Sequence, residues 1–180
     1  MDRLGVPFDR KKNNLLRGIS RMESLEIVLD GRHYSQEEKK AFAEEKNAVY
    51  RGYLASLTPE AITDNVRDTL VALKKNGIKI AIGSSSKNTK FILERVGLLH
   101  EFDAVADGMD IARCKPDPEV FLLAAKRIGV QPSDCMVVED AEAGIEAAVS
   151  GGFVPVAVSD AKSNKKLLIA SRNYLTSLPL

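Results

Sequence analysis

The chain has 180 residues, 44% of them hydrophobic, and its 26 basic and 25 acidic side chains give a net charge of +1. That size and composition fit one globular domain, or a domain with a small partner domain, built around a sizeable core. The balanced charge, without a basic block, gives no support for binding to nucleic acid or to a membrane surface, and no apolar run is long enough to span a bilayer.

The cysteines and the first residues bear on the cellular compartment. Cys114 and Cys135 show no CxxC spacing and no set of histidine partners, so we interpret them as ordinary thiols rather than metal ligands or a disulfide. The first residues lack the apolar core of a secretory signal. We therefore expect a cytoplasmic protein that binds neither nucleic acid nor membranes, and we expect a monomer.

The first third of the chain is predicted to be helical, without a strand. Apolar residues at spacings of three and four indicate two short helices separated by a loop at 17–21, and Gly31 ends the second helix. Ser35 and Glu38 form a capping box for a long third helix. The candidate core contacts along this helix are Phe42, Val49, Tyr53 and Leu57.

The rest of the chain alternates between helical and strand patterns. Helices are predicted at 66–76, 88–96, 117–128 and 141–150, and strands at 78–82, 102–106, 135–138 and 153–158, with a candidate further strand after Leu167. Such alternation predicts parallel strands joined by right-handed crossovers. The fold class is therefore α/β, with a Rossmann-like parallel sheet core over residues 65–180 and an incomplete helical bundle over residues 1–64.

Polar side chains follow the first predicted strand. Hydroxyl, ammonium and amide groups gather there at the start of the next helix, from Ser84, Ser86, Lys87 and Asn88. Free N–H groups and the dipole at a helix N-terminus favour an anion, so this loop is a candidate phosphate cradle. Simple N-capping by Ser86 or Asn88 explains the same residues.

Lys115 lies in a second constrained segment. Pro116 disfavours the helical conformation for Lys115, while Asp117 and Pro118 suit the cap and first turn of the following helix. An ammonium group held just ahead of a helix can neutralise a phosphoryl oxygen or a nearby carboxylate. A solvated surface lysine is the alternative.

Two carboxylates follow the third predicted strand. Glu139 and Asp140 stand where the apolar run 135–138 ends and the next helix begins. Ligands collect at the carboxyl ends of parallel strands, so this pair lies where a divalent metal or a phosphate would be handled. Compensation of the helix dipole by Glu139, Asp140 and Glu142 is the alternative.

The three motifs together have a recognisable order. A serine follows one strand, Lys-Pro precedes a later helix, and Glu-Asp follows the next strand. This order resembles the second, third and fourth signature motifs of the haloacid dehalogenase (HAD) superfamily of phosphotransferases. The loop at 83–88 and the Arg-Gly-Ile-Ser-Arg segment at 17–21 are most similar to the β-phosphoglucomutase branch. The resemblance extends over nearly the whole chain, and it implies that the helical bundle at 1–64 is an incomplete helical cap domain beside a HAD-like core at 65–180.

The resemblance implies a reaction centre made by the three motifs. Ser84 would hydrogen-bond the phosphoryl group that is transferred. Lys115 would hold this group and the nucleophilic carboxylate. Glu139 and Asp140 would bind Mg²⁺, the expected cofactor, which balances charge between the nucleophile and the phosphoryl oxygens.

The resemblance also implies how the expected partner, a small sugar phosphate, is bound. Its second, non-reacting phosphate would be gripped by Arg21, Ser86, Lys87 and Asn88. Ser24 and Lys46 are further candidates for sugar contacts. A helix cap and an exposed helical lysine are the alternative explanations for these two residues.

One signature motif of the superfamily is absent from the 180 residues. The first motif, Asp-x-Asp at the end of the first core strand, supplies the phosphorylated nucleophile and the general acid/base in the family, and no Asp-x-Asp occurs in this chain. We therefore expect the first core strand to be missing. Because that strand would lie between those predicted at 78–82 and 135–138, these two should either leave a slot of about 10 Å or close it by direct pairing.

We expect a phosphotransferase of the β-phosphoglucomutase type, which interconverts β-glucose 1-phosphate and glucose 6-phosphate through a phosphoaspartyl enzyme and a bisphosphate intermediate. The chain itself is expected to be inactive, because covalent catalysis needs the absent carboxylate. The alternatives are a HAD sugar-phosphate phosphatase and a truncated, non-catalytic paralogue that binds Mg²⁺ and phosphosugar. A nucleotide-binding module is disfavoured, since neither common glycine-rich nucleotide motif occurs.

Overall fold

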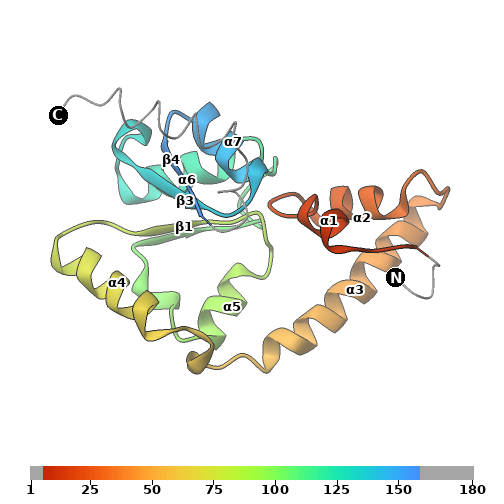
Figure 1. Ribbon diagram of the computed structural model, residues 1–180, viewed down its shortest axis with the longest axis horizontal. Helices are drawn as coiled ribbons and strands as arrows, with labels where there is room; N and C mark the ends of the chain where they lie inside the picture. Colours follow the sequence, from red (N-terminus) through yellow and green to blue (C-terminus); the bar gives the residue numbers. More distant parts are fainter. Residues whose placement is uncertain (1–5, 159–180) are drawn as a thin grey trace.

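The computed structural model describes residues 6–158, and its first third is helical. The helices of this part are α1 (Arg10–Asn14), α2 (Arg21–Leu29) and α3 (Gln36–Ala55). They lie to one side of the strands, and α3 leads across to the rest of the molecule (Figure 1). Among the described residues no strand precedes α3, as predicted. The domain boundary at residue 64 remains a prediction.

Two capping boxes fix where α2 and α3 begin. The Ser20 hydroxyl accepts the N–H of Glu23, and the Glu23 carboxylate accepts the N–H of Ser20. Ser35 and Glu38 make the same pair of bonds, as the sequence predicts. These reciprocal bonds satisfy N–H groups that the helix itself leaves without a partner. Arg21 is consequently the first residue of α2.

Helices and strands alternate after α3 in the predicted order. They are α4 (Asp64–Lys75), β1 (Ala81–Gly83), α5 (Thr89–Arg95), β2 (Ala104–Ala106), α6 (Glu119–Ile128), β3 (Met136–Glu139), α7 (Glu142–Ser150) and β4 (Val154–Ala157). Single 3₁₀ turns occur at Pro59–Ala61, Leu99–Glu101 and Pro132–Asp134. None of the helices within residues 6–158 combines the length and apolar character needed to cross a membrane.

The predicted boundaries differ from the observed ones at several elements. The strand predicted at 78–82 begins only at Ala81, because the Ile80 N–H donates to the Asp103 carboxylate rather than to a neighbouring strand. The other predicted elements within residues 6–158 start or end one or two residues away from the observed bounds. The candidate strand after Leu167 lies outside the described residues.

The four strands form two separate parallel pairs rather than one sheet. In the first pair Ile82 of β1 lies opposite Val105 of β2, and in the second Val138 of β3 lies opposite Val156 of β4. Among the described residues no ladder joins β1 to β3, so these two strands do not pair directly. The slot of about 10 Å remains a prediction. The α/β class with parallel strands is confirmed.

One apolar cluster spans both strand pairs. It is built mainly by α6 and α7, and its buried members are Ala106, Val120, Phe121, Ala124, Ala125, Ala147, Ala148 and Phe153. Ala81 of β1 and Val137 of β3 pack against it. Side chains alternate between faces along a strand, so Ile82 points the other way and packs in a second cluster, with Leu93 of α5. The two strand pairs therefore share one helical layer.

Two predicted core residues of α3 are exposed instead. Val49 and Tyr53 keep 56% and 72% of their surface exposed, whereas α3 buries Ala43 near its start and Leu54 near its end. A helix of 20 residues is about 30 Å long, so α3 reaches α2 with one end and α5 with the other (Figure 1). Val49 and Tyr53 are four residues apart and so share one face of α3, and this face stays exposed.

Candidate functional site

The loop after β1 is held by hydrogen bonds to its own serines. Ser84 Oγ accepts the N–H of Ser86, and Ser86 Oγ accepts the N–H of Asn88. The Ser86 carbonyl accepts hydrogen bonds from Thr89 Oγ1 and from the N–H of Gly108, which follows β2. The loop is therefore fixed from both sides at the carboxyl end of β1.

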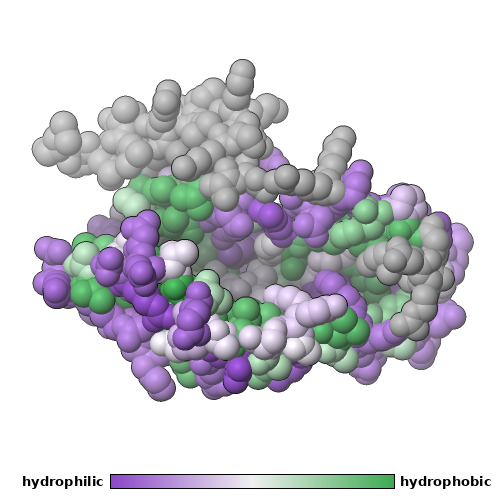
Figure 2. Space-filling model, turned by 60° about the horizontal axis from the view of Figure 1, so that its bottom comes forward, coloured by the Kyte–Doolittle hydropathy of each residue, from purple (hydrophilic) through white to green (hydrophobic). Residues whose placement is uncertain are grey.

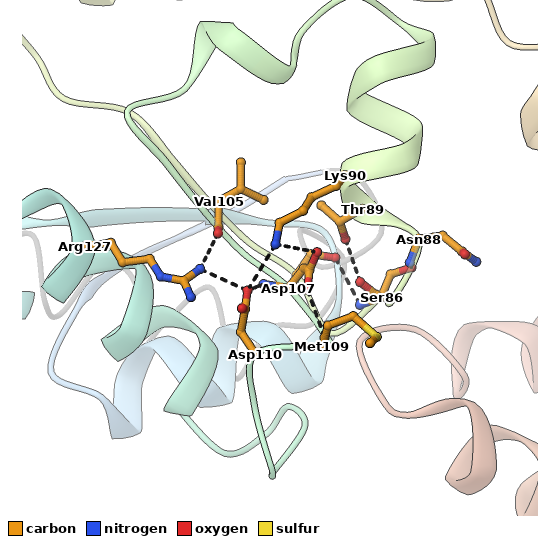
Figure 3. A network of polar contacts seen from close by, with 10 residues as sticks. Ser86, Asn88, Thr89, Lys90, Val105, Asp107, Met109, Asp110 and Arg127 are labelled. Carbon is orange, nitrogen blue, oxygen red and sulfur yellow. Dashed lines mark hydrogen bonds and ion pairs between the residues drawn. The ribbon is translucent and has the colours of Figure 1, made fainter.

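A charged network supports this loop from the side of β2 (Figure 3). The carboxylate of the buried Asp107 lies 3.7 Å from Lys90 Nζ. Asp110 Oδ2 lies 3.9 Å from the same Lys90 nitrogen and 3.0 Å from Arg127 Nη1. Arg127 also donates to the carbonyl of Val105 in β2. Side chains from α5 and α6 thus meet at the turn that follows β2.

Asp110 makes the stability of this network dependent on pH. Hydrogen bonds from Arg127 and from the N–H of Asp107 hold the pKa of the Asp110 carboxyl well below its usual range. Because the pKa of Asp110 is lower in the folded protein than in the unfolded chain, its ionised form stabilises the fold at pH values above the unfolded pKa of about 4. This stabilisation is lost as the pH falls toward the folded-state pKa. We expect Asp110→Asn to be less stable than the unsubstituted chain at pH 7, and to lose less stability between about pH 6 and pH 3.

Urea unfolding across that pH range tests this expectation. The exposed Asp134→Asn serves as the control and should keep the pH profile of the unsubstituted chain. Identical profiles for Asp110→Asn and the unsubstituted chain would contradict it.

Lys115 links the carboxyl ends of β1 and β3. Its N–H donates to Ser85 Oγ at 3.4 Å, just after β1, and its Nζ lies 2.7 Å from Glu139 Oε2, at the end of β3. The ammonium also lies 4.3 Å from the centroid of the Phe121 ring. Because only 6% of Lys115 is exposed, its interpretation as a solvated surface lysine is wrong. It is a buried cation paired with a largely buried carboxylate.

The two carboxylates after β3 have different environments. Burial acts to raise the pKa of Glu139, but the charge and hydrogen bond of Lys115 outweigh it, and the pKa lies below its ordinary value. Burial, a hydrogen bond to Glu139 and the Glu139 charge raise the pKa of Asp140, which Arg17 at 3.4 Å opposes. Glu139 Oε1 also accepts the N–H groups of Asp140 and Ala141 at the start of α7. Opposite pKa shifts in adjacent groups are a common mark of functional sites.

These carboxylates offer the oxygen donors that Mg²⁺ prefers. Asp140 keeps 54% of its side chain exposed. Within residues 6–158 no group of three or more His, Cys, Asp or Glu residues gathers as a complete metal site. Mg²⁺ is usually held by one or two carboxylates, with waters and substrate phosphates as its other ligands. Glu139 and Asp140 therefore fit an Mg²⁺ ion that shares its coordination with a phosphate.

A second polar cluster connects the helical part to the loop after β1. Arg21 Nη2 and Asn88 Nδ2 both donate to Asn47 Oδ1, at 2.7 and 3.0 Å. Arg51 donates to Asn88 Oδ1 at 3.3 Å and stacks over the Phe91 ring at 4.3 Å. The Asn88 side chain makes no helix-capping hydrogen bond, so N-capping does not explain it. Asn47 and Arg51 are not among the residues predicted from the sequence, although their spacing of four places them on one face of α3.

The remaining sequence candidates lie outside both clusters. Ser24 is buried within α2, and it does not cap this helix, since Ser20 occupies the cap position. Lys46 and Lys87 are exposed. Within residues 6–158 none of these three side chains makes a hydrogen bond or an ion pair, so their contact with a sugar phosphate remains a prediction.

An open cleft of about 640 Å³ lies beside the loop that carries Lys115. Ser20 and Glu23 line it from the helical part, and residues 112–114 and 116–118, on either side of Lys115, line it from the core. Gly18 also approaches this region, and a Cβ added there would lie 3.7 Å from the Lys115 side chain. Seen from the side of α4 and α5, the molecule is hollowed near its centre, with hydrophobic and hydrophilic residues mixed around the hollow (Figure 2).

The α/β fold and the buried lysine–carboxylate pair at the strand ends define the class of protein. Residues 3–152 match the family of haloacid dehalogenase-like hydrolases. The chain belongs to this family.

Individual relatives of this chain include mutases and phosphatases of sugar phosphates. Beta-phosphoglucomutase of Bacillus subtilis is 41% identical over 161 residues, which are 87% of this chain and 71% of that protein. Fructose-1-phosphate phosphatase YqaB of Escherichia coli is 38% identical over 119 residues, which are 66% of this chain and 62% of that protein. The crystal structure of beta-phosphoglucomutase from Clostridium difficile matches with a TM-score of 0.82 at 33% identity, covering 98% of this chain and 87% of that chain. The resemblance inferred from the motifs is confirmed.

Proposed function

We propose that this chain serves phosphoryl transfer of the β-phosphoglucomutase type, between β-glucose 1-phosphate and glucose 6-phosphate through a phosphoaspartyl enzyme and a bisphosphate intermediate. The observation that carries the proposal is the buried Lys115–Glu139 pair at 2.7 Å, which joins the ends of two strands beside the Ser84 loop. The identity to the Bacillus subtilis mutase supports the choice of reaction.

The geometry suggests what Ser84 and Lys115 contribute. Ser84 Oγ accepts a hydrogen bond from Ser86, so its own proton remains free to be donated to a phosphoryl oxygen. The Lys115 ammonium has three N–H donors and directs one to Glu139, which leaves others for a phosphoryl oxygen and for an attacking carboxylate. Both groups would stabilise negative charge that develops during transfer.

Mg²⁺ would be held at Glu139 and Asp140. When bound, it supplies charge neutralisation between the nucleophile and the phosphoryl oxygens. The raised pKa of Asp140 means that its ionised form lacks a sufficient positive partner in this arrangement, since Arg17 at 3.4 Å compensates only in part. A cation at this position would favour the ionised form.

The second phosphate of a bisphosphate would be bound by Arg21 together with Ser86, Lys87 and Asn88. Arg21 and Asn88 meet on Asn47, so residues from both parts of the chain converge there. A site for a non-reacting phosphate favours a mutase over a simple phosphatase, because the mutase must hold one phosphate while the other reacts.

We further propose that the 180-residue chain does not turn over by itself, since it holds no Asp-x-Asp segment to supply the nucleophile. A sugar-phosphate phosphatase is the second candidate, and the identity to the Escherichia coli fructose-1-phosphate phosphatase favours it.

We also expect a cytoplasmic monomer. Cys114 and Cys135 are free and half-buried, and burial raises the pKa of both thiols.

Calorimetric titration of the chain with glucose 6-phosphate in excess Mg²⁺ tests the proposal. We expect binding, and we expect Arg21→Ala to weaken it by about tenfold or more, because a charge-assisted hydrogen bond to phosphate is lost. Arg32→Ala is the matched control, since Arg32 is exposed and lies beyond the opposite end of α2. Its affinity should stay within about twofold of the unsubstituted chain.

Activity assays separate the candidate reactions. Incubation with β-glucose 1-phosphate and Mg²⁺ should yield neither glucose 6-phosphate nor inorganic phosphate. Formation of glucose 6-phosphate would contradict the proposed inactivity, and release of inorganic phosphate would favour the phosphatase. Failure of the unsubstituted chain to bind glucose 6-phosphate would contradict the proposed substrate class.

A further inference from the structure

Two guanidinium groups stand at the ends of one series of hydrogen bonds. The series starts at Arg51, whose Nη1 donates to Asn88 Oδ1 at 3.3 Å. Asn88 Nδ2 donates to Asn47 Oδ1 at 3.0 Å, and Arg21 Nη2 donates to the same oxygen at 2.7 Å. The series therefore leads from α3 to the loop after β1, back to α3, and on to the first residue of α2.

The Asn88 side chain is the central member of this series. Only 5% of Asn88 is exposed, and Figure 3 shows its side chain directed away from Lys90 and Asp107. A side-chain amide carries an acceptor at one end and donors at the other, and a buried amide that faces its partners the wrong way loses its hydrogen bonds. The partners of Asn88 therefore decide which end faces Asn47.

Arg51 sets the direction of the Asn88 amide. A guanidinium has five N–H donors, accepts no hydrogen bond and keeps its charge throughout the usual pH range. The end of Asn88 that faces Arg51 must therefore be the oxygen, and the Nδ2 donor then faces Asn47. Asn47 in turn presents its oxygen, which is the acceptor that Arg21 needs.

Arg51 is itself held against α5. The Cζ atom of its guanidinium lies 4.3 Å from the centroid of the Phe91 ring, and Phe91 follows Asn88 by three residues. A cation over an aromatic face is attracted to the ring. Within residues 6–158 neither Arg51 nor Arg21 is paired with an acidic side chain, and their hydrogen bonds go to neutral amide oxygens. Arg21 therefore keeps its charge and most of its donors for an anion.

We infer that Arg51 is a positioning residue, which fixes the orientation of the Asn88 and Asn47 amides and thereby directs Arg21 toward the non-reacting phosphate of a sugar bisphosphate. The inference rests on the proposed function, which places Arg21 at that phosphate. Without Arg51 the Asn88 amide is free to turn its oxygen toward Asn47. Asn47 would then turn its own donor to that oxygen, and Arg21 would lose its acceptor.

NMR signals of the side-chain amides in the free chain give the first test. Arg51→Met keeps a long apolar side chain over Phe91 but removes every donor, and the exposed position of Arg51 leaves the fold intact. We expect the ¹H–¹⁵N signals of the Asn88 and Asn47 side chains to shift in this variant. Arg51→Lys retains a donor and a charge, so it should preserve the signals of the unsubstituted chain.

Arg95→Met is the matched control. Arg95 is also exposed, and its Nε donates to the carbonyl of Leu57 at 3.2 Å, so it too joins α5 to the helical part. Its replacement removes such a link without touching the two amides. We expect the Asn88 and Asn47 signals to stay where they are in the unsubstituted chain.

Calorimetric titration with glucose 6-phosphate in excess Mg²⁺ gives the second test. Arg51→Met should bind about tenfold more weakly, whereas Arg51→Lys and Arg95→Met should stay within about threefold of the unsubstituted chain. The charge of Arg51 could also attract the phosphate directly, so the titration is repeated in an Asn47→Ala background. If Arg51 acts through the amides, Arg51→Met should then weaken binding by less than about twofold, whereas direct attraction would give the same tenfold loss.

Three results would overturn the inference. They are unchanged Asn88 signals in Arg51→Met, equal affinities of Arg51→Met and Arg95→Met, and a tenfold effect of Arg51→Met that persists in the Asn47→Ala background. Each would leave the proposed function standing as long as Arg21→Ala weakens binding. Absence of binding by the unsubstituted chain would instead overturn the proposed function and the phosphate role of Arg21, while the Asn88 signals would still decide whether Arg51 orients the amides.

Discussion

Replacing Lys115 with methionine should lower the free energy of unfolding by about 3–5 kcal/mol, because it strips the partner from a buried carboxylate. Glu139 keeps only 10% of its side chain exposed and lies 2.7 Å from the lysine. Methionine retains most of the aliphatic stem against Phe121, so the loss is mainly electrostatic. Chemical denaturation at pH 7 measures the change.

The sign of the pH dependence distinguishes this cause from a packing defect. In the unsubstituted chain the pKa of Glu139 is lowered, so the ion pair stabilises the protein above the unfolded pKa of about 4.3 and its contribution is lost as the pH falls. Without Lys115 the burial of Glu139 dominates and raises its pKa, so the destabilisation should be largest at neutral pH and shrink toward pH 4. A packing defect would give the same loss at both pH values.

Two further variants complete the experiment. Lys115→Met with Glu139→Gln should recover much of the lost stability, because neither charge is then left alone. Lys40→Met, at an exposed position of α3, should change the stability by less than about 0.5 kcal/mol. If Lys115→Met were as stable as Lys40→Met, the pair would have no structural role.

Replacing Gly144 with alanine should lower the free energy of unfolding by about 1–3 kcal/mol, because α7 has no room for the added methyl group. A Cβ at Gly144 would lie 2.2 Å from Cδ of Glu139. The carboxylate must move to relieve this overlap, and Lys115 then loses its partner at 2.7 Å. Glucose 6-phosphate binding in Mg²⁺ should weaken together with stability, by about tenfold.

Gly52→Ala is the matched control, since Gly52 also lies within a helix, α3, but a Cβ there meets nothing within 4 Å. Helix propensity alone should make this variant more stable by about 0.5–1 kcal/mol. The opposite signs of the two substitutions would isolate the steric contact at Glu139. A stabilising effect at both positions would show that α7 can shift to admit the methyl group.

The sequence could predict the order of helices and strands because the signals for them are local. The capping box of Ser35 and Glu38, for instance, acts within four residues and is observed as predicted. The same holds for the positions of Ser84 and Glu139 at strand ends, which follow from the length of each apolar run, and for that of Lys115 ahead of α6, which follows from the prolines around it. Parallel pairing followed from the alternation itself.

Local signals could not show which side chains of α3 are buried. Its periodicity made Val49 and Tyr53 candidate core residues, but burial depends on a neighbouring element, and these two side chains lie on a face of α3 that stays exposed. Asn47 and Arg51 could not be predicted, because their contacts are made with a residue far away in the sequence. Their partner Asn88 lies 41 and 37 residues away, so no pattern within α3 points to it.

By itself the sequence determined the α/β class, the helical cap pattern and the residue types that stand at the strand ends. Only the tertiary structure decided that Lys115 is buried against Glu139, 24 residues away, and that no ladder joins β1 to β3 within residues 6–158. The physical reason is the range of the forces involved. Caps and periodicity act over one or two helical turns, whereas an ion pair or a strand ladder between distant segments forms only where packing of the whole chain brings its partners together.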